Sequence, residues 1–123
     1  MDTAKYLEQY LEVRGVQGTF LLSRDGMLME KAIREGWYVD GDVFAAGVAQ
    51  IAAACQELGG LLKSEGRSAI VEYDGCLLVL QALPEADAYV AMVAEPGVNL
   101  GLLRLHCTRL RKGLVAVLDP MAG

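Results

Sequence analysis

The chain has few of the residues that build metal sites, catalytic triads and disulfide frameworks. Its 123 residues include one histidine, three cysteines and three prolines. With His106 alone, there is no histidine pair or cluster for a metal ion or a Ser-His-Asp triad. Cys55, Cys76 and Cys107 are odd in number and far apart, which predicts reduced thiols rather than disulfides.

The motifs of common nucleotide-dependent and redox enzymes are also missing. There is no G-x-x-x-x-G-K-[ST] phosphate loop, no G-x-G-x-x-G after an expected strand and no C-x-x-C pair. Glu72 and Asp74 flank Tyr73, but a hairpin turn at Asp74-Gly75 accounts for the aspartate. The sequence therefore predicts a protein that is not an enzyme and holds no cofactor and no metal.

Charge and hydropathy exclude further classes. The formal net charge of −5 argues against nucleic-acid binding and against attachment to anionic lipid. The first residues lack the basic and apolar regions of a signal peptide, and no apolar run reaches the 18 or so residues of a membrane span. We expect a cytoplasmic chain with no direct membrane insertion. Its hydrophobic fraction of 54% is high for a small domain and favours a subunit interface.

The pattern along the chain predicts one α/β domain over residues 1–123. Two tight turns, Arg24-Asp25-Gly26 and Asp74-Gly75, each join two expected strands into a hairpin. We expect helices at about 3–14, 42–64 and 100–118, capped by Asp2 or Thr3, Asp40 or Asp42, and Asn99. The expected strands are 16–23, 27–33, 67–73, 76–82 and 88–94, which would form a mainly antiparallel sheet.

The middle helix is the most informative element. Phe44, Val48, Ile51, Cys55, Leu58 and Leu62 share one stripe at helical spacing and are expected to pack on the sheet. The remaining faces carry mostly alanine and glycine, with one charged residue, Glu57, between Val43 and Leu62. A helix that is apolar nearly all round is usually covered all round, and small side chains let a second helix approach closely.

We therefore predict that this helix packs against the same helix of a second copy, related by two-fold symmetry. The predicted surface for the second copy or a partner comprises Ala45, Ala46, Ala49, Gln50, Ala52, Ala53, Gln56, Glu57 and Gly60. A plainer interpretation also stands, in which alanine is a good helix former that is tolerated at the surface. Gly59-Gly60 either continues or ends the helix.

Two other features leave alternatives open. The last helix has a core stripe of Leu103, Cys107, Leu110 and Leu114, with a cluster of basic residues on its other side. That basic face is either solvated or docks an acidic partner. Trp37 and Tyr38, in the loop before the middle helix, either pin the loop to the core or form an exposed anchor for a partner.

Several segments together resemble the roadblock/dynein-light-chain family. They are Gly15-Val16-x-Gly18-x-x-Leu21-Leu22-x-x-Asp25-Gly26-x-Leu28, the alanine-rich helix, Ile70-Val71-Glu72-Tyr73-Asp74-Gly75-x-Leu77 and Asn99-Leu100-Gly101-Leu102-Leu103-Arg104. Each segment alone is weak, but their order and spacing are fairly specific. The resemblance covers about residues 13–118 and leaves residues 1–14 as an extra N-terminal helix.

The resemblance implies a profilin-like sandwich with a five-stranded sheet, a long central helix and flanking terminal helices. It also implies a homodimer in which the long helices and the neighbouring strands pair. Family members are generally not enzymes, and they bind Ras-like small GTPases or serve as adaptors. Bacterial relatives regulate small GTPases of cell polarity and gliding motility. These properties are expectations for this chain.

Three functions follow as hypotheses. The first is a homodimeric regulator or docking module for a Ras-like GTPase, which orders the GTPase switch regions without supplying a catalytic residue. The second is a structural adaptor with no nucleotide-dependent partner. The third, a small-molecule-binding or enzymatic domain, has no support beyond the predicted sheet.

Overall fold

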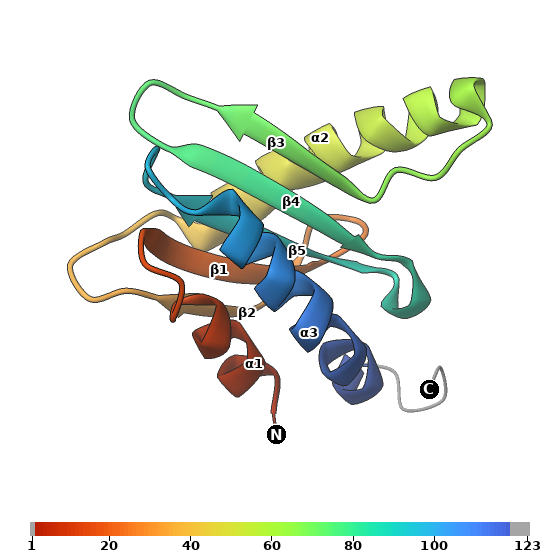
Figure 1. The fold of residues 1–123 in the computed structure, drawn as a ribbon. Coiled ribbons are helices and arrows are strands. Elements are labelled where there is room, and N and C mark those ends of the chain that lie inside the picture. Colours follow the sequence, from red (N-terminus) through yellow and green to blue (C-terminus); the bar gives the residue numbers. More distant parts are fainter. Residues whose placement is uncertain (1, 119–123) are drawn as a thin grey trace.

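The computed structural model describes residues 2–118. They form three layers, with one sheet between two layers of helices (Figure 1). The helices are α1 (Thr3–Tyr10), α2 (Gly41–Leu62) and α3 (Leu100–Leu118), with a short 3-10 turn η1 (Pro84–Ala86). The strands are β1 (Val16–Ser23), β2 (Leu28–Ile33), β3 (Ser68–Glu72), β4 (Leu77–Leu83) and β5 (Ala88–Ala94). These bounds agree with the expected elements to within one or two residues, apart from the end of α1.

The five strands form one antiparallel sheet in the order β2-β1-β5-β4-β3. The two hairpins predicted at the Asp-Gly turns pair β1 with β2 and β3 with β4, and β5 inserts between them. The α/β fold with a five-stranded antiparallel sheet, a long central helix and two terminal helices is therefore confirmed. Its open edges are β2 and β3 (Figure 1).

Local chemistry fixes where the elements begin and turn. The Asp2 Oδ1 atom accepts a hydrogen bond from Lys5 N at 2.9 Å, and Asn99 Oδ1 accepts one from Leu102 N at 2.9 Å. Of the two candidates for the cap of α2, Asp40 takes the position. Gly26 turns the β1–β2 hairpin with φ +93°, a conformation that glycine adopts at little cost.

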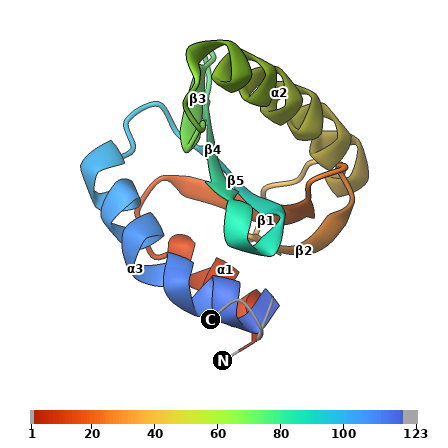
Figure 2. The ribbon, with the colours of Figure 1, turned by 90° about the vertical axis from the view of Figure 1, so that its right-hand side faces the viewer.

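Helices cover both faces of the sheet (Figure 2). The face under α1 and α3 holds the larger buried cluster, which includes the predicted α3 stripe of Leu103, Cys107, Leu110 and Leu114. The face under α2 holds a second cluster built on Phe20, Leu22, Ala45, Val48 and Tyr89. Successive residues of β1 and β5 alternate between the two clusters, as the period of a strand requires.

The first helix is tied into this core. Leu7 and Tyr10 have 0% exposed area, and the buried Thr19 hydroxyl donates a hydrogen bond to the Leu7 carbonyl at 3.0 Å. Arg34 also donates hydrogen bonds to the Val16 and Leu11 carbonyls beyond the end of α1. α1 is therefore packed as part of the domain that extends through α3, whose last described residue is Leu118; residues 119–123 lie outside the described part.

Within residues 2–118, one helix, α2, is long and apolar enough to cross a membrane by length and composition. Only 17% of its most apolar window is buried within the chain, even though one side of the helix packs on the sheet. Most of its apolar surface is thus uncovered within the described residues.

Candidate interaction surface

The side of α2 that faces the sheet is narrower than the sequence stripe suggested. Its buried residues are Gly41, Ala45, Val48 and Ala52. In the predicted stripe only Val48 is buried, while Phe44, Ile51 and Cys55 are half-buried and Leu58 and Leu62 are 57% and 73% exposed. The prediction that Leu58 and Leu62 pack on the sheet is therefore wrong. The stripe is rotated away from the sheet, which contacts the smaller alanine side chains instead.

This rotation leaves large apolar side chains bare on one flank of α2. We call this flank the leucine stripe; it comprises Gly47, Ala54, Leu58, Leu61 and Leu62. Leu61 is 80% exposed, and the spacing of 7, 4, 3 and 1 residues puts all five on adjoining positions of the helix surface. Exposed leucines at consecutive turns of one helix form an apolar patch, a kind of surface at which proteins commonly associate.

The opposite flank of α2 carries small and polar residues. We call it the alanine stripe; it comprises Ala46, Ala49, Ala53, Gln56 and Gly60. The β1–β2 turn lies beside it, because a Cβ added at Gly26 would lie 2.9 Å from the Cβ of Ala49. A ridge of Val43, Gln50 and Glu57 separates the two stripes.

The nine residues predicted as an interaction surface fall into three groups. Ala46, Ala49, Ala53, Gln56 and Gly60 make up the alanine stripe, and Gln50 and Glu57 lie on the outer ridge. Ala45 and Ala52 have 0% and 2% exposed area and lie against the sheet, so their placement on the outer surface is corrected. Sequence reasoning missed the leucine stripe because Leu58 and Leu62 had been assigned to the core and Leu61 had not been singled out.

The two open edges of the sheet differ in their readiness to pair. β3 pairs with β4 in an unbroken register from Ser68 to Glu72, so its free edge is regular. In β2 the register with β1 shifts, because Leu21 pairs with Glu30 and Leu22 with Leu28, which leaves Met29 as an extra residue. Bulges at a sheet edge obstruct further strand pairing. The β3 edge is therefore the better template for another strand.

Exposed apolar side chains also accompany β3. Ile70 is 38% exposed on the side of the sheet away from α2, and Tyr73, just after the strand, is 52% exposed. On the other side, Ala69 and Val71 are only half-buried beneath α2. Both faces of this edge thus lack complete cover within the chain.

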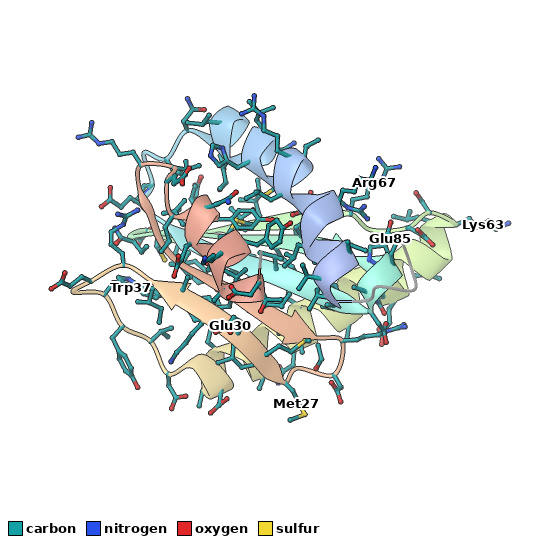
Figure 3. The ribbon with its side chains drawn as sticks, turned by 90° about the horizontal axis from the view of Figure 1, so that it is seen from below. Met27, Glu30, Trp37, Lys63, Arg67 and Glu85 are labelled. Carbon is teal, nitrogen blue, oxygen red and sulfur yellow. The ribbon has the colours of Figure 1, made fainter. Side chains whose placement is uncertain are left out.

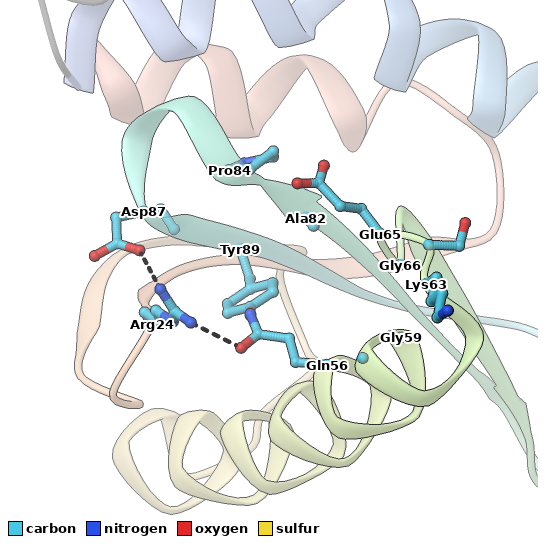
Figure 4. Close-up of a pocket in the computed structure, with 13 residues that line it drawn as sticks. Arg24, Gln56, Gly59, Lys63, Glu65, Gly66, Ala82, Pro84, Asp87 and Tyr89 are labelled. Atoms are coloured by element: carbon cyan, nitrogen blue, oxygen red, sulfur yellow. Dashed lines mark hydrogen bonds and ion pairs between the residues drawn. The ribbon is translucent and has the colours of Figure 1, made fainter.

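A cavity of about 600 Å³ opens between the C-terminal half of α2 and the β4–β5 turn (Figure 4). Four polar residues from four segments meet at one end of it. Arg24 donates hydrogen bonds to Gln56 Oε1 at 3.0 Å and to Asp87 Oδ1 at 3.4 Å, and the Gln56 amide donates one to the Tyr89 hydroxyl. Partial burial raises the pKa of the Tyr89 hydroxyl above its usual value. Lys63 and Glu65 lie at the other end (Figure 4).

No sequence motif predicted this polar network. Its members lie far apart along the chain, and only the pairing of β1 with β5 and the crossing of α2 bring them together. Gln56 alone had been selected, as part of the predicted partner surface.

The loop before α2 resolves the alternatives for its aromatic pair. The Trp37 ring packs on Phe20 with a centroid distance of 6.3 Å, whereas Tyr38 is 79% exposed. Trp37 therefore pins the loop to the core. Seen from below, Trp37 and Met27 lie beyond opposite ends of β2, and Met27 projects freely from the hairpin end with 67% exposure (Figure 3).

The basic face of α3 is largely solvent-facing. One of its residues, Arg111, forms an ion pair with Glu85 of η1 at 2.6 Å, which lowers the pKa of that carboxyl. Arg104, Arg109 and Lys112 are exposed. Within residues 2–118, no group of three His, Cys, Asp or Glu side chains is placed to hold a metal ion.

Several solved structures share the fold of this chain. The gliding protein MglB from Thermus thermophilus has a TM-score of 0.85 with 23% identity, over 96% of this chain and 89% of that chain. Myxococcus xanthus MglB has a TM-score of 0.86 with 17% identity, over 97% and 96%. A Roadblock/LC7 domain from Streptomyces avermitilis has a TM-score of 0.82 with 19% identity, over 93% and 95%. At these identities the likeness concerns the fold.

Among curated proteins, none matches the chain. The sequence itself does match a family model, the Roadblock/LC7 domain, over residues 3–86. That match begins at the first residue of α1 and runs through all of α2 and the β3–β4 hairpin to the end of η1. It covers more than half of the chain, and with it the family resemblance found in the sequence is confirmed. The chain belongs to the Roadblock/LC7 domain family.

Proposed function

We propose that the chain is a non-enzymatic, cytoplasmic homodimer that docks or regulates a Ras-like small GTPase. The observation that supports the dimer is the exposed leucine stripe of α2 together with the regular free edge of β3. The C-terminal half of α2 lies beside β3 (Figure 2). Pairing of β3 with its symmetry mate would continue the sheet, and pairing of α2 with its mate would bury Leu58 and Leu61.

Three physical arguments support this assembly. First, burying the exposed leucines against a mate would stabilise the dimer by about 25 cal/mol for each Å² of apolar surface removed from water. Second, the two-fold mate presents the same strand edge and the same stripe, so the contact is self-complementary. Third, Gly47 and Ala54 are small residues, which let two helices approach closely where they cross. One solved structure with this fold, MglB, is described with a tetrameric arrangement, so a roadblock fold can self-associate.

The GTPase proposal rests on the family. Roadblock proteins bind Ras-like GTPases or act as adaptors, and the chain is shown to belong to this family by its match over residues 3–86. A binding module speeds hydrolysis by ordering the switch regions of the GTPase, which needs no catalytic side chain from the module. A net charge of −5 leaves nucleic acid a poor partner.

A pull-down distinguishes the two leading functions. The purified chain is immobilised and offered each small GTPase of its own genome, loaded with GDP or with a non-hydrolysable GTP analogue. Retention that depends on the nucleotide supports GTPase regulation. Failure with every GTPase in both states would leave the alternative, a structural adaptor without a nucleotide-dependent partner. A gene for a P-loop GTPase beside this one favours the first function, and a motor or sensor-kinase gene favours the second.

A further inference from the structure

The helix α3 carries positive charge on a chain that is acidic elsewhere. Its cations are Arg104, Arg109, Arg111 and Lys112, and it contains no aspartate or glutamate. The formal net charge of the chain is −5, so the +4 of α3 leaves −9 on the other residues. Charges that serve solubility alone are interspersed over a surface, so this separation favours a binding role for α3.

Four exposed residues of α3 lie in one row. We call them the α3 stripe; they are Leu102, Leu105, Arg109 and Lys112. Their spacing of 3, 4 and 3 residues puts them on adjoining positions of the helix surface. Leu102 and Leu105 are 40% and 43% exposed. The stripe is therefore apolar in its first half and cationic in its second half.

The cations of this surface are available to another molecule. Among residues 2–118, the side chains of Arg104, Arg109 and Lys112 form no ion pair or hydrogen bond. The neighbouring helix α1 carries Glu8 and Glu12, but neither carboxylate forms an ion pair with α3 within the described residues. Three cations thus have no anion opposite them.

The fourth cation, Arg111, shows which anion this helix binds. One of its guanidinium nitrogens donates hydrogen bonds to both carboxylate oxygens of Glu85, at 2.7 and 2.6 Å. Glu85 lies in η1, so a carboxylate from a separate segment docks on a cation of α3. Guanidinium groups match carboxylates in geometry and charge, so Arg104 and Arg109 can bind carboxylates of a partner in a similar way.

We infer that the α3 stripe, with Arg104 beside it, is a docking surface for an acidic peptide segment of another protein. Leu102 and Leu105 contact apolar side chains at one end of this segment, and the cations bind carboxylates along the rest of it. Because α3 and α2 lie on opposite faces of the sheet, this partner leaves the α2 surface free (Figure 2). The inference therefore does not depend on the proposed GTPase function.

Anionic membranes and nucleic acids fit this surface less well than a peptide. Membrane-binding clusters commonly contain about 4–8 cations, whereas Arg104, Arg109 and Lys112 make three. Both polyanions are extended, so the −9 on the rest of the chain would repel them. A short peptide instead lies within the screening length, about 8 Å, of the local cations.

Binding of synthetic peptides to the full chain tests this surface. The probe is a dye-labelled peptide of about ten residues, long enough in extended form to follow the stripe, in which leucines precede a run of glutamates. One companion peptide has serines in place of the leucines, and another has lysines in place of the glutamates. Fluorescence anisotropy gives the Kd at low and high salt. A short DNA duplex and phosphatidylserine vesicles are the competing polyanions.

Two charge-matched double variants locate the binding surface. Arg109→Glu with Lys112→Glu reverses both charges of the stripe. Arg14→Glu with Lys31→Glu is the control, because these residues are also exposed and the net charge changes equally. Leu105→Ser removes one apolar contact. Circular dichroism and the mass in solution show that each variant keeps its fold and its assembly.

We expect the leucine-glutamate peptide to bind the unmodified chain, more weakly at high salt, and the lysine peptide not to bind. Reversal of Arg109 and Lys112 should weaken binding at least about tenfold, the control pair should stay within about threefold, and Leu105→Ser should weaken binding about threefold. Failure of the peptide to bind, or equal binding by the reversed variant, would overturn the inference. Equal binding of the serine peptide, or a preference of α3 for DNA or vesicles, would overturn it as well.

Discussion

Gly26 and Ala49 lie in direct apposition: a Cβ added at Gly26 would lie 2.9 Å from the Cβ of Ala49. This contact joins the tip of the β1–β2 hairpin to the middle of α2, two segments that the chain separates by more than twenty residues. It gives at least one alanine of α2 a structural reason, because no larger side chain fits beneath the turn. The alanines of α2 therefore occur for more than one structural reason.

Ala49→Leu should destabilise the fold. The added side chain meets the hairpin turn, and overpacking of this kind costs about 1–3 kcal/mol of unfolding free energy. Ala53→Leu, one turn further along the same stripe, is the matched control; Ala53 is exposed, so the cost should stay within about 0.5 kcal/mol. Urea unfolding followed by circular dichroism measures both. Equal stability of the two variants would contradict the close packing of the turn.

Tyr10→Phe should stabilise the fold. The Tyr10 hydroxyl is buried and, among the described residues, has no hydrogen-bond partner; burial raises its pKa well above the usual value. Removing a buried unsatisfied hydroxyl relieves its desolvation cost, so we expect a gain of about 1 kcal/mol in unfolding free energy. Tyr6→Phe serves as the control, because Tyr6 is only half-buried. A loss of stability in Tyr10→Phe would mean that this hydroxyl has a partner.

Cys107 should be the unreactive thiol. It is 7% exposed, and burial raises the pKa of its thiol to about 11, whereas Cys55 and Cys76 are half-buried. Because the thiolate is the reactive form, two thiols of the folded chain, those of Cys55 and Cys76, should react with Ellman's reagent at pH 8. The third, that of Cys107, should react only in denaturant. Cys107→Ala should abolish the slow thiol. Three fast thiols in the folded chain would contradict the packing of α3.

The same shift has a consequence for stability. A raised pKa in the folded state means that folding favours the protonated thiol. This contribution is complete below the unfolded pKa near 9 and is lost as the pH rises toward about 11. Cys107→Ala should flatten the fall in unfolding free energy across that window, which denaturation at several pH values measures.

Much of the fold follows from local sequence patterns, and the position of α2 does not. Turn chemistry at Asp25-Gly26 and Asp74-Gly75 and a cap at Asn99 set the element boundaries. The helical pattern identifies which residues share a face, but it does not say which face meets the sheet. The small side chains of Ala45 and Ala52 pack on the sheet, and Leu58 is left outside.

The polar network at the cavity was beyond sequence reasoning for a related reason. Arg24, Gln56 and Tyr89 meet only after β5 inserts between the two hairpins and α2 crosses above it. None of these residues belongs to a motif, and each is ordinary in its own segment. The fold, rather than any local spacing, creates this polar network at the cavity.

Leu61→Glu should break the proposed dimer without unfolding the chain. Leu61 is 80% exposed, so a charge there costs the monomer little, but burying that charge against a mate is expensive. We expect the dissociation constant of the dimer to rise at least about tenfold, with an unchanged circular dichroism spectrum. Leu105→Glu on α3, 43% exposed, is the control and should leave the mass unaltered. An unchanged mass for Leu61→Glu would move the interface away from the leucine stripe.

The most direct test of the account is the mass of the unmodified chain in solution. Size-exclusion chromatography with light scattering at low micromolar concentration compares it with the monomer mass of 13.2 kDa. A mass of about twice that value is the predicted result, because the leucine stripe and the β3 edge need a second copy to cover them. A mass of 13.2 kDa under these conditions would contradict the homodimer and leave α2 to be covered by a different protein.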